Sequence, residues 1–146
     1  KMDSMIPYFV LFKKEAHALA KYELFRNPIA GWFLHKMGAI PVRRGEADVE
    51  SVKQVLRVLK SGKQLLIFPE GTRNRTDKSL LAFKPGAAAI AKRGNALIVP
   101  FAISGEYRKN ANLKILFGEP FSPESMSVEE ATDKLYSAVS NLLESQ

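Results

Sequence analysis

The short apolar run at residues 64–68 is the feature that most constrains how this chain folds. It reads QLLIF, follows a segment with helical spacing, and stops at Pro69. An unbroken apolar run after a helix is typical of a parallel strand buried on both faces. Because Pro cannot donate a ladder hydrogen bond, the strand must end there. The run therefore predicts a parallel sheet whose strands are joined by helices.

The rest of the chain alternates segments typical of helices with segments typical of strands. Helices are expected after Ser4, over Pro28–Lys36, from an Asp48 cap to Gly62, over 85–93 with Gly94 at its end, and from a Ser127/Glu130 capping box to the end of the chain. Strands are expected at 15–19, 39–42, 64–68, 96–103 and 113–117, with 96–103 as a second buried strand. We predict one α/β domain over residues 1–146, with a mostly parallel central sheet flanked by helices.

Composition excludes several classes of protein. The 146 residues are 46% hydrophobic and 25% charged, which is typical of one globular domain. Cys is absent and only two His are present, so a disulfide framework, a thiolate nucleophile and a His-rich metal site are excluded. No apolar run approaches the ~18 residues that span a bilayer, and the first residues do not fit a secretory signal. We expect a cytosol-facing domain, at most peripheral to a membrane.

The positive charge is unevenly distributed. Of 22 Lys and Arg residues only two lie after residue 109, whereas six of the 15 Asp and Glu residues do. The basic body indicates an anionic partner, either a nucleic acid, an anionic lipid or a phosphorylated metabolite, unless the charge only keeps the surface solvated. No basic run with interleaved aromatic residues occurs, so nucleic acid is not expected as a partner.

The segment after the 64–68 strand carries the densest functional signal. It begins a long polar loop, 69–84, at the carboxyl end of a strand, where α/β proteins bind ligands. Gly71 lets backbone approach a ligand, Thr72 offers a hydroxyl and Arg73 offers a fork for phosphate. Glu70 would hold Arg73 or a substrate hydroxyl. An ordinary turn with solvated charges is the alternative.

Two further cations stand where strands or helices end. Arg44 follows the 39–42 strand, so in a parallel sheet it would emerge on the same edge as Arg73 and share one phosphate with it. Lys84 stands just ahead of the helix expected at 85–93, whose positive end also favours an anion. Each cation could equally be a solvated surface charge.

Neither histidine is expected to be a catalytic base. His17 lies in a probable strand and His35 near a helix end, with no Asp, Ser or Cys at a triad-like spacing. The residues alone therefore indicate a phosphate pocket without an obvious base.

Three blocks in order resemble those of the 1-acylglycerol-3-phosphate (lysophosphatidic acid) acyltransferases of the glycerolipid acyltransferase superfamily. The G-x-I-x-x-x-R block reads Gly38, Ile40 and Arg44, and the E-G-T-R block occupies 68–73, with Asn74 where Ser is usual. The V-P block is Ile98-Val99-Pro100, and the segments AKYELF (20–25) and FKPG (83–86) also look like the family. The resemblance covers most of the chain, from about residue 3 to 103.

The family's first block, H-x-x-x-x-D, is expected to be cut by the start of the chain. Asp3 fits its Asp, and the partner His would be the third residue upstream of Lys1. The chain is then a fragment that lacks the catalytic His and an amino-terminal anchor, and is expected to be inactive as given. The alternative is a native relative that lacks the His altogether.

The resemblance implies transfer of a fatty acyl group from an acyl thioester to the sn-2 hydroxyl of 1-acylglycerol-3-phosphate, giving phosphatidic acid. The His would take the hydroxyl proton while Asp3 orients its imidazole. The resemblance implies that the acyl donor is a thioester of CoA or of acyl-carrier protein, and that no metal or cofactor takes part. It also implies that the protein works at the cytoplasmic face of the cell membrane. The expected roles are phosphate binding by Arg44, Arg73 and Lys84, a glycerol pocket of Glu70, Gly71 and Thr72, and support by Gly38, Ile40, Pro69, Val99 and Pro100.

A second function stays open at this point, that of a non-catalytic peripheral module on anionic phospholipid. Residues 22–36 carry Phe25, Trp32 and Phe33 and are amphipathic enough to lie on a bilayer. Core packing is nevertheless the more usual fate of such a stripe, so we expect these aromatic residues to be buried.

Overall fold

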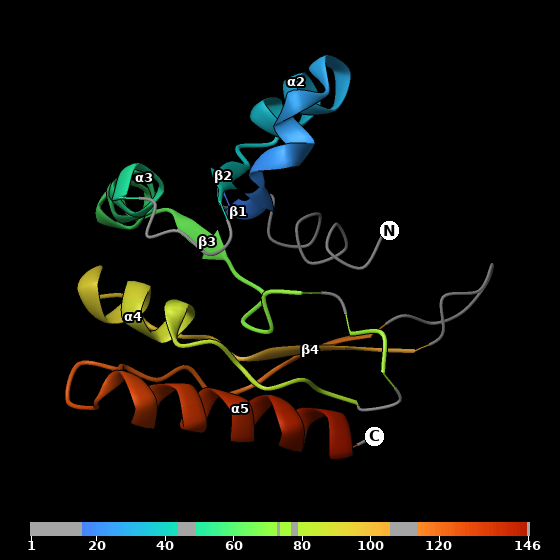
Figure 1. Cartoon of the computed structure of the whole chain (residues 1–146). Helices are drawn as coiled ribbons and strands as arrows, with labels where there is room; N and C mark the ends of the chain where they lie inside the picture. The colour runs from blue at the N-terminus through green and yellow to red at the C-terminus, as the bar shows by residue number, and fades with distance from the viewer. Residues whose placement is uncertain (1–15, 44–48, 73, 77–78, 106–113, 146) are drawn as a thin grey trace. The chain divides into compact units, whose positions relative to one another are not determined.

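The computed structural model describes residues 16–43, 49–72, 74–76, 79–105 and 114–145, which fall into two compact units (Figure 1). The first unit ends at Ile67 and the second begins at Phe68. The expected helix after Ser4 and the Asp48 cap lie outside the described residues.

The first unit is built on a three-stranded parallel sheet. Its strands are β1 (Ala16–Lys21), β2 (Ile40–Val42) and β3 (Gln64–Leu66), in the order β2-β1-β3. The register pairs Leu19 with Ile40 and Ala16 with Gln64. The predicted parallel sheet is thus confirmed. All three carboxyl ends lie at one edge, as they must in a parallel sheet.

Three helical elements lie among the described residues of this unit. A 3₁₀ helix, η2 (Tyr22–Arg26), leads into α2 (Pro28–Lys36), whose bounds match the prediction. Asn27 begins α2 because its side chain accepts the N–H groups of Ile29 and Ala30, both at 3.0 Å.

The other helix, α3 (Val49–Lys60), packs on β2 and β3. Its Val55 is buried, as is Ile40 of β2, and the Ser51 hydroxyl donates to the Pro41 carbonyl at 2.7 Å. Val52, Leu56 and Leu59 are half-buried on the same helix, whereas Val49 is exposed.

The second unit packs a long helix on an antiparallel hairpin. Strands β4 (Phe101–Ser104) and β5 (Lys114–Phe117) pair with Phe101 opposite Phe117. Helix α4 (Gly86–Arg93) packs beside α5 (Val128–Glu144), which also contacts β4 (Figure 1). The core cluster of this unit is made by Ala102, Leu135 and Val139.

The capping box at the start of α5 is confirmed. The Ser127 hydroxyl accepts the Glu130 N–H at 3.0 Å, and the Glu130 carboxylate accepts the Ser127 N–H at 2.7 Å. Hydrogen bonding from the Ser127 backbone, and then from its side chain, lowers the pKa of the Glu130 carboxyl. The box therefore satisfies two amide groups at the helix start.

The expected strand at 96–103 is partly wrong. Strand structure begins only at Phe101, pairs antiparallel, and is preceded by a single bridge between Ile98 and Phe121. Buried Pro100 has no N–H for a ladder, which separates the bridge from the strand. The 64–68 strand is also shorter than expected, since β3 ends at Leu66 and Phe68 is exposed.

Two smaller features also differ from the sequence-based expectation. The short helix η2 was not predicted from the sequence. At the end of α4, Gly94 keeps a φ of −85° and Asn95 takes the left-handed conformation with a φ of 47°. Asn tolerates this region better than most residues, so the chain turns one position later than expected.

Candidate active site

The predicted functional loop at 69–84 is closed at its base by backbone hydrogen bonds. The Lys84 N–H donates to the Pro69 carbonyl at 2.8 Å, and the Gly71 N–H donates to the Phe68 carbonyl at 3.0 Å. Phe83 anchors the end of the loop, with its ring 5.1 Å from that of Tyr136 on α5. The loop therefore projects from a fixed base.

Glu70 ties the two sides of this loop together. Its Oε2 accepts the backbone N–H of Leu81 at 2.9 Å, in a half-buried position. Because a charged acceptor makes a stronger hydrogen bond than a neutral one, this contact holds the loop closed. From the sequence we expect the Glu70 carboxylate to hold either Arg73 or a substrate hydroxyl. Arg73 lies outside the described residues, and the Leu81 contact was not anticipated.

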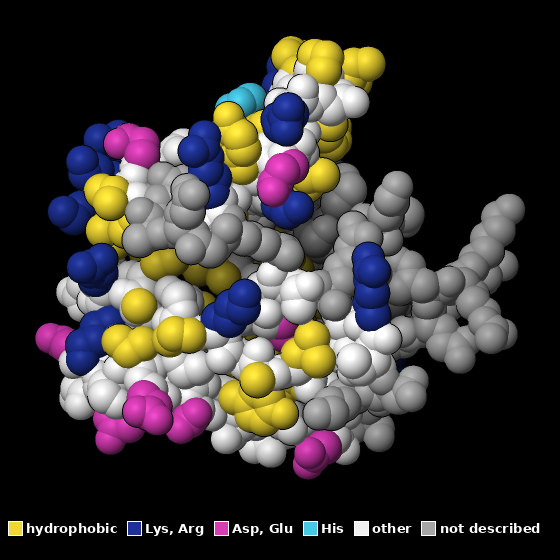
Figure 2. All heavy atoms as spheres, viewed as in Figure 1, with side chains coloured by type: hydrophobic (Ala, Val, Ile, Leu, Met, Phe, Trp, Pro, Cys, Tyr) yellow, Lys and Arg dark blue, Asp and Glu magenta, His cyan; other side chains and the backbone are white. Residues whose placement is uncertain are grey.

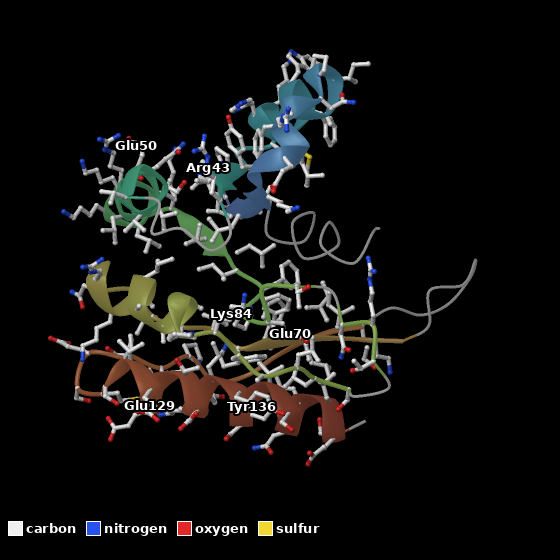
Figure 3. The ribbon with its side chains drawn as sticks, in the orientation of Figure 1. Arg43, Glu50, Glu70, Lys84, Glu129 and Tyr136 are labelled. Carbon is white, nitrogen blue, oxygen red and sulfur yellow. The ribbon has the colours of Figure 1, made fainter. Side chains whose placement is uncertain are left out.

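Gly71 and Lys84 lie against each other. Gly71 has a φ of +66°, and a Cβ there would meet Lys84 Cδ at 3.0 Å, Cε at 3.2 Å and Nζ at 3.3 Å. Figure 3 shows Glu70 and Lys84 on the segment that leads into α4. The position therefore favours Gly, both for its conformation and because the Lys84 side chain crosses it. This contact brings the ammonium to the E-G-T-R backbone.

Lys84 also lies at the start of α4, as predicted. Pro85 caps α4 without a side-chain hydrogen bond, and the first turn holds no acidic residue. No hydrogen bond or ion pair joins the Lys84 ammonium to another described residue. An exposed cation beside the positive end of a helix suits an anionic group such as a phosphate.

The carboxyl edge of the first unit's sheet carries its own cations. β1 ends at Lys21, whose Nζ lies 3.2 Å from Glu23 Oε1. Arg43 follows β2, and its guanidinium carbon lies 4.5 Å from the centroid of the Tyr22 ring (Figure 3). Lys21 was not among the predicted site residues. A basic residue at the carboxyl end of a strand, the kind of signal used for Arg44, would have found it.

Gly38 and Ile40 make structural contacts in the first unit, and their support of a ligand site stays a prediction. The Gly38 carbonyl accepts the Nδ1–H of His17 at 2.8 Å, and Ile40 is buried. His17 therefore links β1 to the turn before β2. The His35 ring meets the Phe25 ring edge-on, with ring centroids 4.9 Å apart. Both histidines have structural contacts.

The V-P block lies beside β4 rather than within it. Pro100 is fully buried and its carbonyl accepts the Gly118 N–H at 2.9 Å, whereas Val99 is exposed. Pro100 thus stabilises the hairpin of the second unit, and Val99 contributes little to its core.

The structure brings together only some of the predicted site residues. Pro69, Glu70, Gly71, Thr72 and Lys84 share one loop, in which Thr72 is exposed. Asp3, Arg44 and Arg73 lie outside the described residues, so the sharing of one phosphate by Arg44 and Arg73 stays a prediction. Among the described residues no group of three or more His, Asp or Glu could hold a metal ion.

The fold and this loop define an α/β protein with a cationic loop after a parallel strand. The chain belongs to the acyltransferase family, whose model matches residues 1–104. It is 40% identical over 111 residues to the 1-acyl-sn-glycerol-3-phosphate acyltransferase of Bacillus subtilis (strain 168), covering 73% of this chain and 54% of that protein.

The 1-acyl-sn-glycerol-3-phosphate acyltransferase of Streptococcus pneumoniae (strain ATCC BAA-255 / R6) is 29% identical to this chain over 150 residues, covering 99% of this chain and 54% of that protein. The chain thus spans about half the length of the curated relatives it matches. The crystal structure of the 1-acyl-sn-glycerophosphate (LPA) acyltransferase PlsC from Thermotoga maritima shares the fold, with a TM-score of 0.73 at 24% identity over 90% of this chain and 56% of that one. No helix in the described part of this chain is long and apolar enough to cross a membrane.

Proposed function

We propose that the protein carrying this chain transfers a fatty acyl group from an acyl thioester to the sn-2 hydroxyl of 1-acylglycerol-3-phosphate, giving phosphatidic acid. The observation that carries the proposal is the Lys84 ammonium lying across Gly71 in the E-G-T-R loop. The two bacterial relatives are 1-acyl-sn-glycerol-3-phosphate acyltransferases, which supports this acceptor. A phosphate monoester is the group that this cationic loop suits.

The chemistry assigns separate tasks to separate residues. A His five positions ahead of Asp3 takes the proton of the sn-2 hydroxyl, and the resulting nucleophile attacks the thioester carbonyl. Asp3 holds the imidazole and stabilises its charged form. The thiolate leaves, and the proton returns through the imidazole. No covalent acyl-enzyme is needed, and the donor is acyl-CoA or acyl-carrier protein.

Phosphate binding supplies the orientation. Arg44, Arg73 and Lys84 hold the phosphate, which fixes the distance from the acceptor hydroxyl to the base. Glu70 acts through the loop: by accepting the Leu81 N–H it holds the loop in which Gly71 lies against Lys84. The acceptor and the product are lipids, so the protein works at a membrane surface, for which we propose the cytoplasmic face.

The first test concerns Lys84. Initial rates of phosphatidic acid formation are measured with the gene product that carries this chain, at varied acceptor and fixed thioester. Because a hydrogen bond to a charged group is worth more than a neutral one, Lys84→Gln should raise the acceptor KM about tenfold or more and leave the thioester KM unchanged. Lys84→Arg should recover part of the loss.

Lys114→Gln is the matched control, because Lys114 is an exposed cation on β5 in the same unit. Equal acceptor KM values for Lys84→Gln and Lys114→Gln would show that Lys84 does not bind the acceptor. No transfer by the gene product to any lysolipid, together with retained binding to anionic vesicles, would instead favour the non-catalytic lipid-binding module. The exposed aromatic residues of α2 are the observation that keeps this second function open.

A further inference from the structure

The segment η2–α2 displays an unusual amount of apolar surface. Five of the eleven exposed large hydrophobic side chains among the described residues come from this short stretch. They are Tyr22 at 39%, Leu24 at 51%, Ile29 at 80%, Trp32 at 61% and Phe33 at 46% exposed. The expectation that Trp32 and Phe33 pack in the core is therefore wrong, while Phe25 is half-buried against His35.

Helix α2 has no polar face that would balance this exposed apolar surface. Its sequence is PIAGWFLHK, its one buried residue is Gly31, and its charge sits only in the last turn. A helix that is apolar all round normally lies inside a protein or a membrane. Figure 2 shows hydrophobic side chains gathered over this segment with Lys and Arg side chains beside them.

The charges around this surface are positive. Arg26 ends η2 and Lys36 ends α2, and both are exposed. The Lys36 ammonium lies 4.7 Å from the centroid of the Trp32 ring. Residues 21–43 hold a single acidic residue, Glu23, which is paired with Lys21. The surface thus complements an anionic partner, and a second copy docked through the same surface would oppose like charges.

The segment is also held in shape before any partner binds. A Cβ on Gly31 would lie 2.7 Å from the Phe25 carbonyl oxygen, so η2 and α2 touch backbone to backbone. The Asn27 cap fixes the angle between them. At 1.5 Å per residue the nine residues of α2 extend about 13 Å, less than half of a ~30 Å hydrocarbon core. Such a helix lies in the interface and does not cross it.

We infer that η2–α2 is a docking face for an anionic phospholipid bilayer, with Ile29, Trp32 and Phe33 inserted below the headgroups and Arg26 and Lys36 against them. This inference rests on the proposed function for the membrane partner and adds the surface that meets it. Docking there would place the protein on the membrane that holds its acceptor.

The only Trp of the chain makes the test direct. The full 146-residue chain is mixed with vesicles of phosphatidylcholine plus phosphatidylglycerol, and with phosphatidylcholine alone. Trp32 emission should shift to shorter wavelength with the anionic vesicles, and brominated acyl chains should quench it. Ile29→Ser/Phe33→Ser should weaken vesicle binding about tenfold or more, because two apolar side chains no longer leave water.

Val49→Ser is the matched control, because Val49 is 62% exposed on the charged helix α3. It should leave binding unchanged, and circular dichroism should show that all variants are folded. Vesicle binding with unchanged Trp32 emission, or equal losses for both sets of variants, would overturn the inference. So would self-association that Ile29→Ser/Phe33→Ser abolishes and lipid does not affect.

A separate assay distinguishes failure of docking from failure of the proposed function. Acyl transfer is measured in the gene product with the acceptor in detergent micelles and in vesicles. The Ile29→Ser/Phe33→Ser variant should keep its micellar rate and lose its vesicle rate. An unchanged vesicle rate contradicts docking at this face, whereas no transfer by the unsubstituted protein in either system contradicts the proposed function alone.

Discussion

The two α-helices described in the first unit, α2 and α3, differ in how far they bury their side chains. α3 buries Val55 and Ser51 against the sheet and turns Lys53, Arg57 and Lys60 to solvent. α2 buries only Gly31 and exposes Ile29 and Trp32. Packing within the unit therefore accounts for the pattern of α3 and not for that of α2. Because packing within the unit does not explain the exposed apolar side chains of α2, we assign them to contact with an external partner.

The largest expected effect separates stability from surface function. Val55→Asp buries a charge without a partner, so it should lower the free energy of unfolding by about 4 kcal/mol or more, or prevent folding. Ile29→Asp should change it by less than about 0.5 kcal/mol, since Ile29 is 80% exposed. Urea unfolding followed by circular dichroism measures both free energies. Similar losses of stability in the two variants would show that the fold depends on Ile29 as much as on Val55.

The next effect tests the backbone contact that shapes α2. Gly31→Ala should destabilise the protein by about 1–3 kcal/mol, because the new Cβ would meet the Phe25 carbonyl oxygen at 2.7 Å. Gly86→Ala in α4 is the control: nothing lies within 4 Å of its Cβ position, so the change should be neutral or stabilise by up to about 1 kcal/mol. If the two variants have the same thermal midpoint, the close packing of η2 on α2 is not a source of stability.

The smallest effect compares how the two helices are anchored. Ser51→Ala removes the hydrogen bond from α3 to the Pro41 carbonyl, and Asn27→Ala removes the cap of α2. Each should cost about 1 kcal/mol. Only Asn27→Ala should also weaken vesicle binding, because only α2 meets the lipid. Equal vesicle binding by the two variants would mean that the angle of α2 is irrelevant to docking.

Local signals explain which elements could be predicted from the sequence. α2 has Pro28 at its first position and Gly38 just beyond its end, and α5 begins with the Ser127/Glu130 box. These signals act within a few residues, so the bounds of both helices follow from the sequence. The parallel sheet also follows, because apolar runs between helices have few other uses.

Contacts between distant residues explain what could not be predicted. The β4 strand starts later than predicted because Pro100 interrupts the ladder. Its start also depends on its antiparallel partner β5, which lies further along the chain. The Glu70–Leu81 hydrogen bond spans eleven positions of a loop without periodicity. The same holds for Lys84 across Gly71: residue types indicated a cationic site, but only the folded loop shows that these two touch.

We propose that the loop at 69–84 serves an acyltransferase whose acceptor carries a phosphate. The most direct measurement supplies the gene product with acyl-CoA or acyl-carrier-protein thioester and compares 1-acylglycerol-3-phosphate with 1-acylglycerol, which lacks the phosphate. We expect acylation of the phosphate-bearing acceptor, with a preference of about tenfold or more that Lys84→Gln reduces. Equal rates with both acceptors, or a preference that Lys84→Gln leaves intact, would contradict it.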